Sequence, residues 1–425
     1  MLLVKDLREN PDKIKEALKK RCNDDLLGYV DQAIKIDQTR RETQGKLDET
    51  LAQQKKISQE IGLLMRDGKK DDAEKVKIQV SDLKAQAQEL KQQLSNAENE
   101  LQNTLYQIPN TPHDSVNAGK SEDDNETIQE SGTKPDLSKS AVPHWELAER
   151  YDLIDFELGV KITGAGFPVY KGKGARLQRA LINFFLDQAQ DAGYREVIPP
   201  LIVNEDSGYG TGQLPDKEGQ MYHIQNENFY LIPTAEVPIT NIYRDEILKS
   251  TDLPIQVCGY TPCFRREAGS YGKDVRGLNR LHQFDKVEIV QIAHPDKSYE
   301  ILEQMVNHVK SLLEKLELPY RILRLCGGDL GFAAAITYDF EVYSAAQDKW
   351  LEVSSVSNFE TYQSNRLKCR FRGDEDKSTQ WVHTLNGSAL ALPRVMAALL
   401  ENNQTENSIN IPKALRAYTS FETIE

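Results

Sequence analysis

The sequence has 425 residues, of which 39% are hydrophobic and 28% are charged, and its formal net charge is −13. This length predicts two or more domains, and no apolar run reaches 18 residues, which argues against a membrane-spanning helix. Because phosphate repels a chain with so large a negative charge, any contact with nucleic acid requires local basic patches.

The first residues and the cysteines bear on the cellular compartment. The opening stretch MLLVKDLREN carries charges at once and lacks the apolar core of a signal peptide, so we expect a cytoplasmic protein. The five cysteines are odd in number and form no CxxC pair. The sequence therefore predicts neither a disulfide framework nor a structural zinc site.

Residues 1–108 are expected to form an N-terminal domain built around a long helical hairpin. A short helical cap over residues 1–27 precedes residues 30–106, which contain no proline and are rich in Gln, Lys, Glu, Asp and Leu. In the second half of this region, apolar residues follow a heptad pattern on one helix stripe: Val76, Val80, Leu83, Ala87, Leu90, Leu94, Ala97 and Leu101. In the first half, apolar residues lie near one face and Gln54 interrupts them: Leu47, Leu51, Ile57, Ile61 and Leu64. A polar turn over residues 66–72 separates the halves, so we expect two antiparallel helices of about 35 residues and roughly 50 Å each.

The rest of the chain divides into a linker and a larger domain. Residues 109–143 show no periodicity and are rich in Pro, Asp, Ser and Asn, which is typical of a linker. From residue 144 to residue 425, long helical stretches alternate with short β-rich runs that mostly follow one another directly. This order predicts an α+β domain with an antiparallel sheet flanked by helices.

Two segments of this domain predict a nucleotide site. The stretch FRRE over residues 264–267 is followed by a glycine-rich loop and then by RLHQFDKVE over residues 280–288. Arg265 and Glu267 are expected to share one strand face, as are Phe284 and Glu288. A guanidinium on this face can bind a phosphate through two hydrogen bonds, and an aromatic ring beside it can carry adenine.

A third segment, NGSALALPR over residues 386–394, precedes the apolar helix VMAALLENN. Pro393 fits the first turn of that helix, so Arg394 is expected near the positive end of the helix, where an anion is favoured. The helix and strand over residues 174–200 end in two prolines. Between these segments, Glu352 and Ser355 offer the oxygen ligands that hard cations prefer.

Together the three segments over residues 174–200, 264–288 and 386–394 resemble the signature of class II aminoacyl-tRNA synthetases. Three further stretches resemble the bacterial type of the seryl-tRNA synthetase family: TAE at residues 234–236, GKDVRGLNRLHQFDKVE, and EVSSVSNFETYQSNR beside TLNGSALALPR. The resemblance covers nearly the whole chain, including the N-terminal hairpin. Two positions depart from the family pattern, since Arg266 stands where a small residue is usual and Ala389 where glycine is common.

The resemblance implies an ATP-dependent ligase that attaches L-serine to tRNA(Ser) through a seryl-adenylate. It implies that Arg265 and Arg394 are catalytic, contacting the α- and γ-phosphates, and that Glu352 and Ser355 hold Mg²⁺. The implied ATP-binding residues are Arg265, Arg266, Glu267, Leu281, Phe284, Glu352, Val353, Ser354, Ser355 and Arg394. The implied serine-binding residues are Thr234, Ala235, Glu236, Arg265, Glu288 and Ser388. The division of roles among these side chains and Thr384 stays open.

The family resemblance also implies partners. The hairpin is expected to bind the long variable arm of tRNA through basic residues near its tip: Arg66, Lys69, Lys70, Lys75 and Lys77. A selenocysteine tRNA remains open as a second acceptor, and a homodimer is expected from the family.

Two alternatives remain from the sequence. The first is a class II ligase that loads an amino acid onto a carrier protein, which a missing hairpin would favour. The second is a non-catalytic coiled-coil adaptor with a relic synthetase domain, which loss of Arg265, Glu288 or Arg394 would favour. The hairpin pattern and all three residues are present.

Overall fold

The computed structural model describes residues 1–137, 141–217, 219–267, 276–373 and 378–425. The chain forms two compact units. One comprises Leu2–Lys19 and Asn23–Pro109, and the other comprises Met1, Lys20–Cys22 and Asn110–Glu425. Most of the glycine-rich loop after residue 267 lies outside the described residues.

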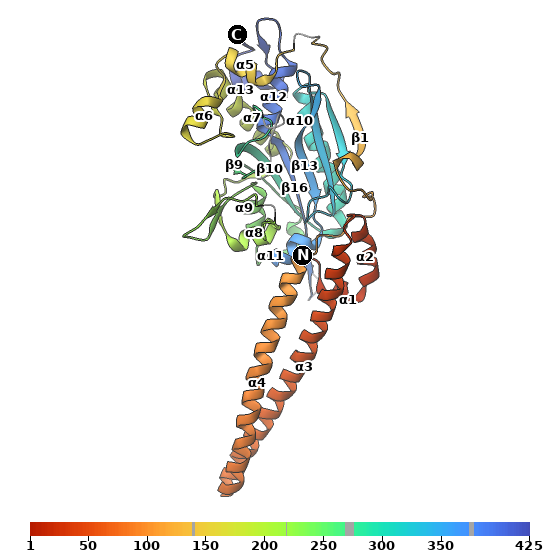
Figure 1. Ribbon diagram of the computed structural model, residues 1–425, viewed down its shortest axis with the longest axis vertical. Coiled ribbons are helices and arrows are strands. Elements are labelled where there is room, and N and C mark those ends of the chain that lie inside the picture. The colour runs from red at the N-terminus through yellow and green to blue at the C-terminus, as the bar shows by residue number, and fades with distance from the viewer. Residues whose placement is uncertain (138–140, 218, 268–275, 374–377) are drawn as a thin grey trace. The chain divides into compact units, whose positions relative to one another are not determined.

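The first unit is helical and contains α1 (Val4–Glu9), α2 (Pro11–Lys19), α3 (Asp25–Arg66) and α4 (Lys70–Leu105). Helices α3 and α4 run side by side (Figure 1) and are joined by a three-residue turn at residues 67–69. The predicted hairpin is thus confirmed. All eight apolar residues of the seam predicted on α4 are buried or half-buried.

The seam on α3 differs from the expected one. Leu51 is 38% exposed, whereas Thr50 is buried and Gln54 is half-buried. The inward-facing positions are therefore 47, 50, 54, 57, 61 and 64, an unbroken heptad pattern in which Gln54 is a member and not an interruption. A long glutamine side chain can pack its methylene groups in the seam while its amide reaches water, so helix geometry overrides hydrophobicity here.

The second unit is built on an eight-stranded sheet of order β1-β11-β12-β13-β16-β10-β9-β4. Neighbouring strands pair antiparallel, except that β4 pairs with β9 in parallel. This confirms the predicted α+β class. The strands of this sheet are β1 (Glu126–Ser131), β4 (Arg195–Glu196), β9 (Ile255–Phe264), β10 (Gln283–Ala293), β11 (Tyr320–Arg324), β12 (Ile336–Ser344), β13 (Lys349–Asn358) and β16 (His383–Ala391).

Helices and smaller sheets surround this sheet. The helices are α5 (His144–Arg150), α6 (Phe156–Ile162), α7 (Gly172–Asp191), α8 (Glu205–Thr211), α9 (Glu236–Asn241), α10 (Ser298–Lys315), α11 (Thr361–Leu367), α12 (Leu392–Asn402) and α13 (Lys413–Thr419). The smaller sheets consist of β2 (Ile154–Asp155) with β3 (Val169–Tyr170), β5 (Ile202–Asn204) with β7 (Phe229–Leu231) and β6 (His223–Ile224), β8 (Ile247–Lys249) with β14 (Arg370–Arg372) and β15 (Thr379–Trp381), and β17 (Ile409–Asn410) with β18 (Thr423–Ile424).

The segment expected to be a linker also contributes to the sheet. Strand β1 lies within residues 109–143 and pairs with β11 at the edge of the large sheet. Its side chains are mostly exposed and polar. An edge strand that packs little of its surface needs no alternation of apolar residues, so the sequence pattern gave no sign of it.

Strand β10 shows how the sheet separates the core from a polar surface. Val287 and Ile289 belong to the main apolar core. Helices α7, α10 and α12 contact strands of the large sheet and contribute side chains to the same core. Lys286 and Glu288 point to the opposite face. Further along that face, Val290 and Ile292 join a second core with residues of α9 and α11. The charged pair Lys286 and Glu288 therefore lies where the second face opens into a cavity.

Candidate active site

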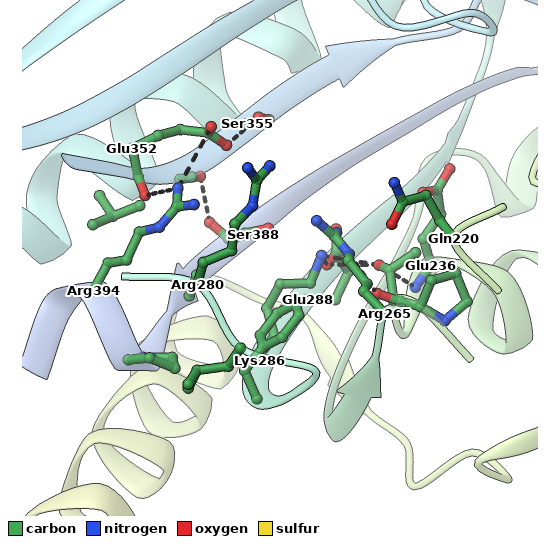
Figure 2. Close-up of a pocket in the computed structure, with 18 of the residues that line it drawn as sticks. Gln220, Glu236, Arg265, Arg280, Lys286, Glu288, Glu352, Ser355, Ser388 and Arg394 are labelled. Carbon is green, nitrogen blue, oxygen red and sulfur yellow. Dashed lines mark hydrogen bonds and ion pairs between the residues drawn. The ribbon is translucent and has the colours of Figure 1, made fainter. Parts of the chain in front are cut away.

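A cavity of about 480 Å³ opens on the polar face of the sheet. Strands β10, β13 and β16 form its floor, with the residues after β9 and the start of α12 at its rim. In Figure 2, Arg394, Glu352 and Ser355 lie toward one end, and Arg265 and Glu236 lie toward the other. The cavity is lined by most of the side chains predicted for ATP and serine: Thr234, Glu236, Arg265, Glu267, Leu281, Phe284, Glu288, Glu352, Val353, Ser354, Ser355, Ser388 and Arg394.

Two predicted residues do not reach this cavity. Ala235 is fully buried and contributes to the apolar core beneath the second face of the sheet. Arg266 donates its backbone N–H to the carbonyl of Gln220 at 2.8 Å, and its side chain does not line the cavity. The side chain of Arg266 therefore lies outside the cavity, although its neighbour Arg265 lines it.

The backbone around Arg265 differs from the strand expected there. Strand β9 ends at Phe264, and Glu267 has a positive φ of 48°, so Arg265 and Glu267 do not share a strand face. Both nevertheless line the cavity. The guanidinium of Arg265 lies 5.2 Å from the ring centroid of Phe284 and donates from Nε to the carbonyl of Pro233 at 3.3 Å. These contacts fix Arg265 while leaving its guanidinium at the cavity.

Arg394 is held at the start of α12, where Pro393 occupies the first turn as expected. Its Nε donates to the carbonyl of Asn279 at 2.9 Å, and its Nη1 donates to the carbonyl of Glu352 at 2.8 Å. Nη1 also lies 3.6 Å from the carboxylate of Glu352. Ala389 has no positive φ, so its methyl group meets no backbone strain.

Buried charges gather at the Glu236 end of the cavity. The Nζ of Lys286 lies 2.6 Å from Oε2 of Glu288 and donates to Oγ1 of Thr234 at 2.9 Å. Thr234 in turn donates to Glu288 at 3.2 Å. Lys286 was not among the predicted site residues. The sequence contained the signal for it, because Lys286 lies between Phe284 and Glu288 at two-residue spacing and therefore shares their strand face.

Glu236 lies beside this cluster at the start of α9 and is 6% exposed. Burial and the negative charge of Glu288 raise the pKa of Glu236 to about 7. Its Oε1 accepts from Nε2 of Gln363 at 2.6 Å, and Gln363 accepts from Thr384 at 2.7 Å. Thr384, considered as a possible substrate contact, therefore stands behind the cavity wall and not in it.

Comparisons with known proteins identify the family. A family model described as the seryl-tRNA synthetase N-terminal domain matches residues 1–112, and one described as the tRNA synthetase class II core domain (G, H, P, S and T) matches residues 221–403. The chain is 51% identical to the serine–tRNA ligase of Salinibacter ruber, with 100% of this chain and 99% of the relative covered. It is 48% identical to that of Bacillus subtilis, with 98% of each chain covered.

The chain belongs to the seryl-tRNA synthetase family. The solved structure of the seryl-tRNA synthetase from Pyrococcus horikoshii, complexed with ATP, superimposes with a TM-score of 0.93 at 34% identity, covering 100% of this chain and 99% of that one. The activity is that of a serine–tRNA ligase, so the predicted enzyme class is confirmed. The two alternatives, a ligase that loads a carrier protein and a non-catalytic coiled-coil adaptor, are therefore rejected.

In this seryl-tRNA synthetase fold, a buried network that the motifs did not reveal supports the Arg394 end of the cavity. The Nε2 of His144 accepts from the backbone N–H of Leu278 at 2.8 Å, and its Nδ1 lies 2.6 Å from Oε1 of Glu401. Both side chains are fully buried. Leu278 lines the cavity, and Glu401 lies on α12 with Arg394. The network therefore links the chain after the glycine-rich loop to the helix that carries Arg394.

In the N-terminal domain of the synthetase, the basic residues predicted for tRNA are all exposed: Arg66, Lys69, Lys70, Lys75 and Lys77. Lys75 lies 3.6 Å from Asp72, and Lys77 pairs with Glu74. Arg66 is the last residue of α3 and Lys70 the first of α4. Within the described part of the chain, no helix combines the length and the apolar character needed to cross a membrane.

Proposed function

We propose that the cavity over the sheet binds ATP and serine together and joins them as seryl-adenylate. The observation that carries this proposal is that Arg265 and Arg394, 129 positions apart in the sequence, line one cavity. The ATP complex of the Pyrococcus horikoshii relative supports ATP as the nucleotide. The adenylate then passes its seryl group to the terminal ribose of tRNA(Ser).

The two arginines bind different phosphates of ATP. Arg265 binds the α-phosphate, which must lie near serine, and Arg394 binds the γ-phosphate near the N-terminus of α12, where the helix dipole favours an anion. Phe284 and Glu267 hold adenine, with Leu281, Val353 and Ser354 completing the wall. Arg265 contributes most directly to catalysis of adenylate formation, because its guanidinium stabilises the charge that develops on the α-phosphate.

Charged and hydroxyl side chains bind serine at the Glu236 end of the cavity. Glu236 and Glu288 supply two carboxylates and Lys286 one ammonium, so these three side chains carry a net charge of −1 when Glu236 is ionised. This charge matches the serine ammonium, while Arg265 faces the serine carboxylate. Thr234 and Ser388 offer hydroxyl partners. A site that hydrogen-bonds a hydroxyl rejects alanine by leaving its own polar groups unpaired.

Glu352 and Ser355 have the chemistry to hold Mg²⁺. The Oγ of Ser355 lies 3.4 Å from Oε1 of Glu352, and the Glu352 carboxylate is half exposed at the cavity. The described residues contain no cluster of three or more metal-binding side chains. A single carboxylate with a hydroxyl, completed by ATP phosphates and water, is the donor set that Mg²⁺ accepts. Bound there, the ion would neutralise phosphate charge.

The first step requires no general base. The serine carboxylate is already ionised at neutral pH and attacks the α-phosphorus, while pyrophosphate leaves with the electron pair of the broken bond. The protein contributes position and charge stabilisation. Adenylate formation thus needs no proton acceptor from the protein, and the acyl transfer that follows needs a bound tRNA.

The helical unit and the surface suggest the partners. We infer that the tip of the α3–α4 hairpin contacts the tRNA backbone through its exposed basic residues. Large apolar side chains are exposed near the end of the segment over residues 174–200, with Ile198 at 88% exposure, and this supports a homodimer. The five free thiols fit a cytoplasmic location.

Serine-dependent exchange of pyrophosphate into ATP tests the function. We expect exchange with serine and little with alanine, glycine or threonine, and subsequent charging of tRNA(Ser). Exchange that does not depend on serine, or charging without exchange, would contradict the proposal. Charging of a selenocysteine tRNA by the same preparation would show whether that tRNA is a second acceptor.

A further inference from the structure

Gln363 is a buried side chain with a polar contact to the site that no motif reveals. It lies on α11, is 1% exposed and does not line the cavity. Its Nε2 donates to Oε1 of Glu236 at 2.6 Å and to the carbonyl of Thr211 at 3.1 Å. Its Oε1 accepts from Oγ1 of Thr384 at 2.7 Å. Both N–H groups of the amide are therefore used, and one of them reaches a carboxylate at the cavity.

The orientation of this amide is determined by its neighbours. The carbonyl of Thr211 can only accept, so the amide nitrogen must be the atom that faces it. The same nitrogen faces Glu236. Thr384 supplies a donor to the oxygen on the other side. A rotated amide would place its one oxygen against both the Thr211 carbonyl and the Glu236 carboxylate, which is unfavourable at both contacts.

Glu236 needs such a donor because its surroundings oppose its charge. Burial raises the pKa of Glu236, the carboxylate of Glu288 on β10 raises it further, and the ammonium of Lys286 on β10 lowers it. From β16 the amide of Asn386 also lowers its pKa, as Gln363 does from α11. A hydrogen bond to the charged form of a buried carboxyl stabilises that form. Gln363 itself does not line the cavity, so bound serine does not displace this donor.

We propose that Gln363 is a positioning residue for serine: its amide keeps Glu236 ionised and directs the free carboxylate oxygen toward the substrate. This inference rests on the proposed serine site. Thr384 and the carbonyl of Thr211 hold the amide in place, so the serine end of the cavity depends on a relay from α8 and β16 through α11 to α9. The relay acts on the charge of Glu236 and touches no substrate atom.

The variant Gln363→Met tests the relay, because methionine has a similar length and no donor. In serine-dependent pyrophosphate exchange, we expect the KM for serine at neutral pH to rise about tenfold, the size of a lost hydrogen bond to a charged group. The acid limb of kcat/KM for serine should move to higher pH by about one unit, because Glu236 protonates more readily. The KM for ATP should stay unchanged.

Gln291→Met is the matched control. Gln291 is also 1% exposed and donates from Nε2 to the hydroxyl of Tyr194 at 2.7 Å, but it does not line the cavity or contact Glu236. We expect this variant to keep the wild-type KM for serine and the wild-type pH profile. A loss of buried hydrogen bonding in general would affect both variants alike.

Thr384→Val provides a second route if Gln363→Met does not fold. It removes the donor to Oε1 of Gln363 and should raise the KM for serine about threefold. In the Gln363→Met background it should add nothing, because contacts within one network are not additive. An unshifted pH profile in Gln363→Met, or in Thr384→Val alone, would overturn the relay. If the wild-type protein lacks serine-dependent exchange, the proposed function itself fails.

Discussion

The ammonium of Lys286 and the carboxylate of Glu288 lie 2.6 Å apart, two residues apart on β10, and both face the cavity. Both side chains are almost entirely buried. Because this pair cancels its own charge, the charge available to an incoming ammonium depends on Glu236. The pair also holds Thr234 between its members. Serine selection is therefore linked to the protonation of a single carboxyl group.

The pH dependence of serine binding follows from Glu236. Its pKa is raised to about 7 by burial and by Glu288, so it gains a proton as the pH falls through that value. The net charge of the three side chains then goes from −1 to zero, and the KM for serine should rise. We expect Glu236→Gln to raise the KM at every pH and to remove its dependence near pH 7, as measured by exchange at saturating ATP. A variant that retains the wild-type dependence would assign the titration to another group.

The neighbouring arginines 265 and 266 form a matched pair. Arg265→Ala should lower kcat for pyrophosphate exchange by about 10²-fold or more, because it removes a charged donor from the developing charge on phosphorus. Arg266→Ala should change exchange less than about threefold, since its side chain does not line the cavity. Circular dichroism would show that both variants fold. Equal losses in the two variants would contradict the placement of Arg265.

Glu352 should determine the magnesium requirement. Glu352→Gln keeps the shape of the side chain and the backbone carbonyl that accepts from Arg394, but it removes the negative charge next to Ser355. We expect the concentration of Mg²⁺ for half-maximal exchange to increase about tenfold, with saturation still reached. Titration of Mg²⁺ at fixed ATP measures this shift. An unchanged midpoint would place the ion elsewhere.

The tip of the hairpin should affect charging and not exchange. Lys70→Glu reverses an exposed charge at the first residue of α4. We expect kcat/KM for tRNA to fall about three- to tenfold at low salt, with a shallower salt dependence, because a phosphate contact is lost. Lys413→Glu, an exposed lysine at the start of α13, is the control. Reduced exchange in Lys70→Glu would mean that the substitution disturbs more than tRNA binding.

Ile198 should contribute to self-association. This side chain is 88% exposed, which is unusual for a large apolar residue, so burial in a second copy would gain roughly 2 kcal/mol. We expect Ile198→Asp to weaken the dimer by at least about tenfold in Kd, as measured by analytical ultracentrifugation. Ile78→Asp, at a side chain 65% exposed on α4, should leave the association state unchanged. A wild-type protein that is monomeric at all concentrations would rule out the dimer.

The sequence by itself determined the features that depend on short-range periodicity. The heptad seam on α4 and the shared strand face of Phe284 and Glu288 on β10 follow from helix and strand geometry, so the sequence alone predicts both. The arginines 265 and 394 were found because their neighbours resemble family motifs. Chemistry encoded within a few consecutive residues is readable in this way.

The tertiary structure decided the features that depend on where an element ends and on what lies behind it. The end of β9 at Phe264 means that Arg265 and Glu267 do not share a strand face, and the packing of α11 against α8 and β16 brings Gln363 to Glu236. Gln54 belongs to the α3 seam for the same reason: position in space, not hydrophobicity, assigns it there. Buried polar contacts join residues more than a hundred positions apart, and their energy depends on distance and desolvation, neither of which a linear pattern records.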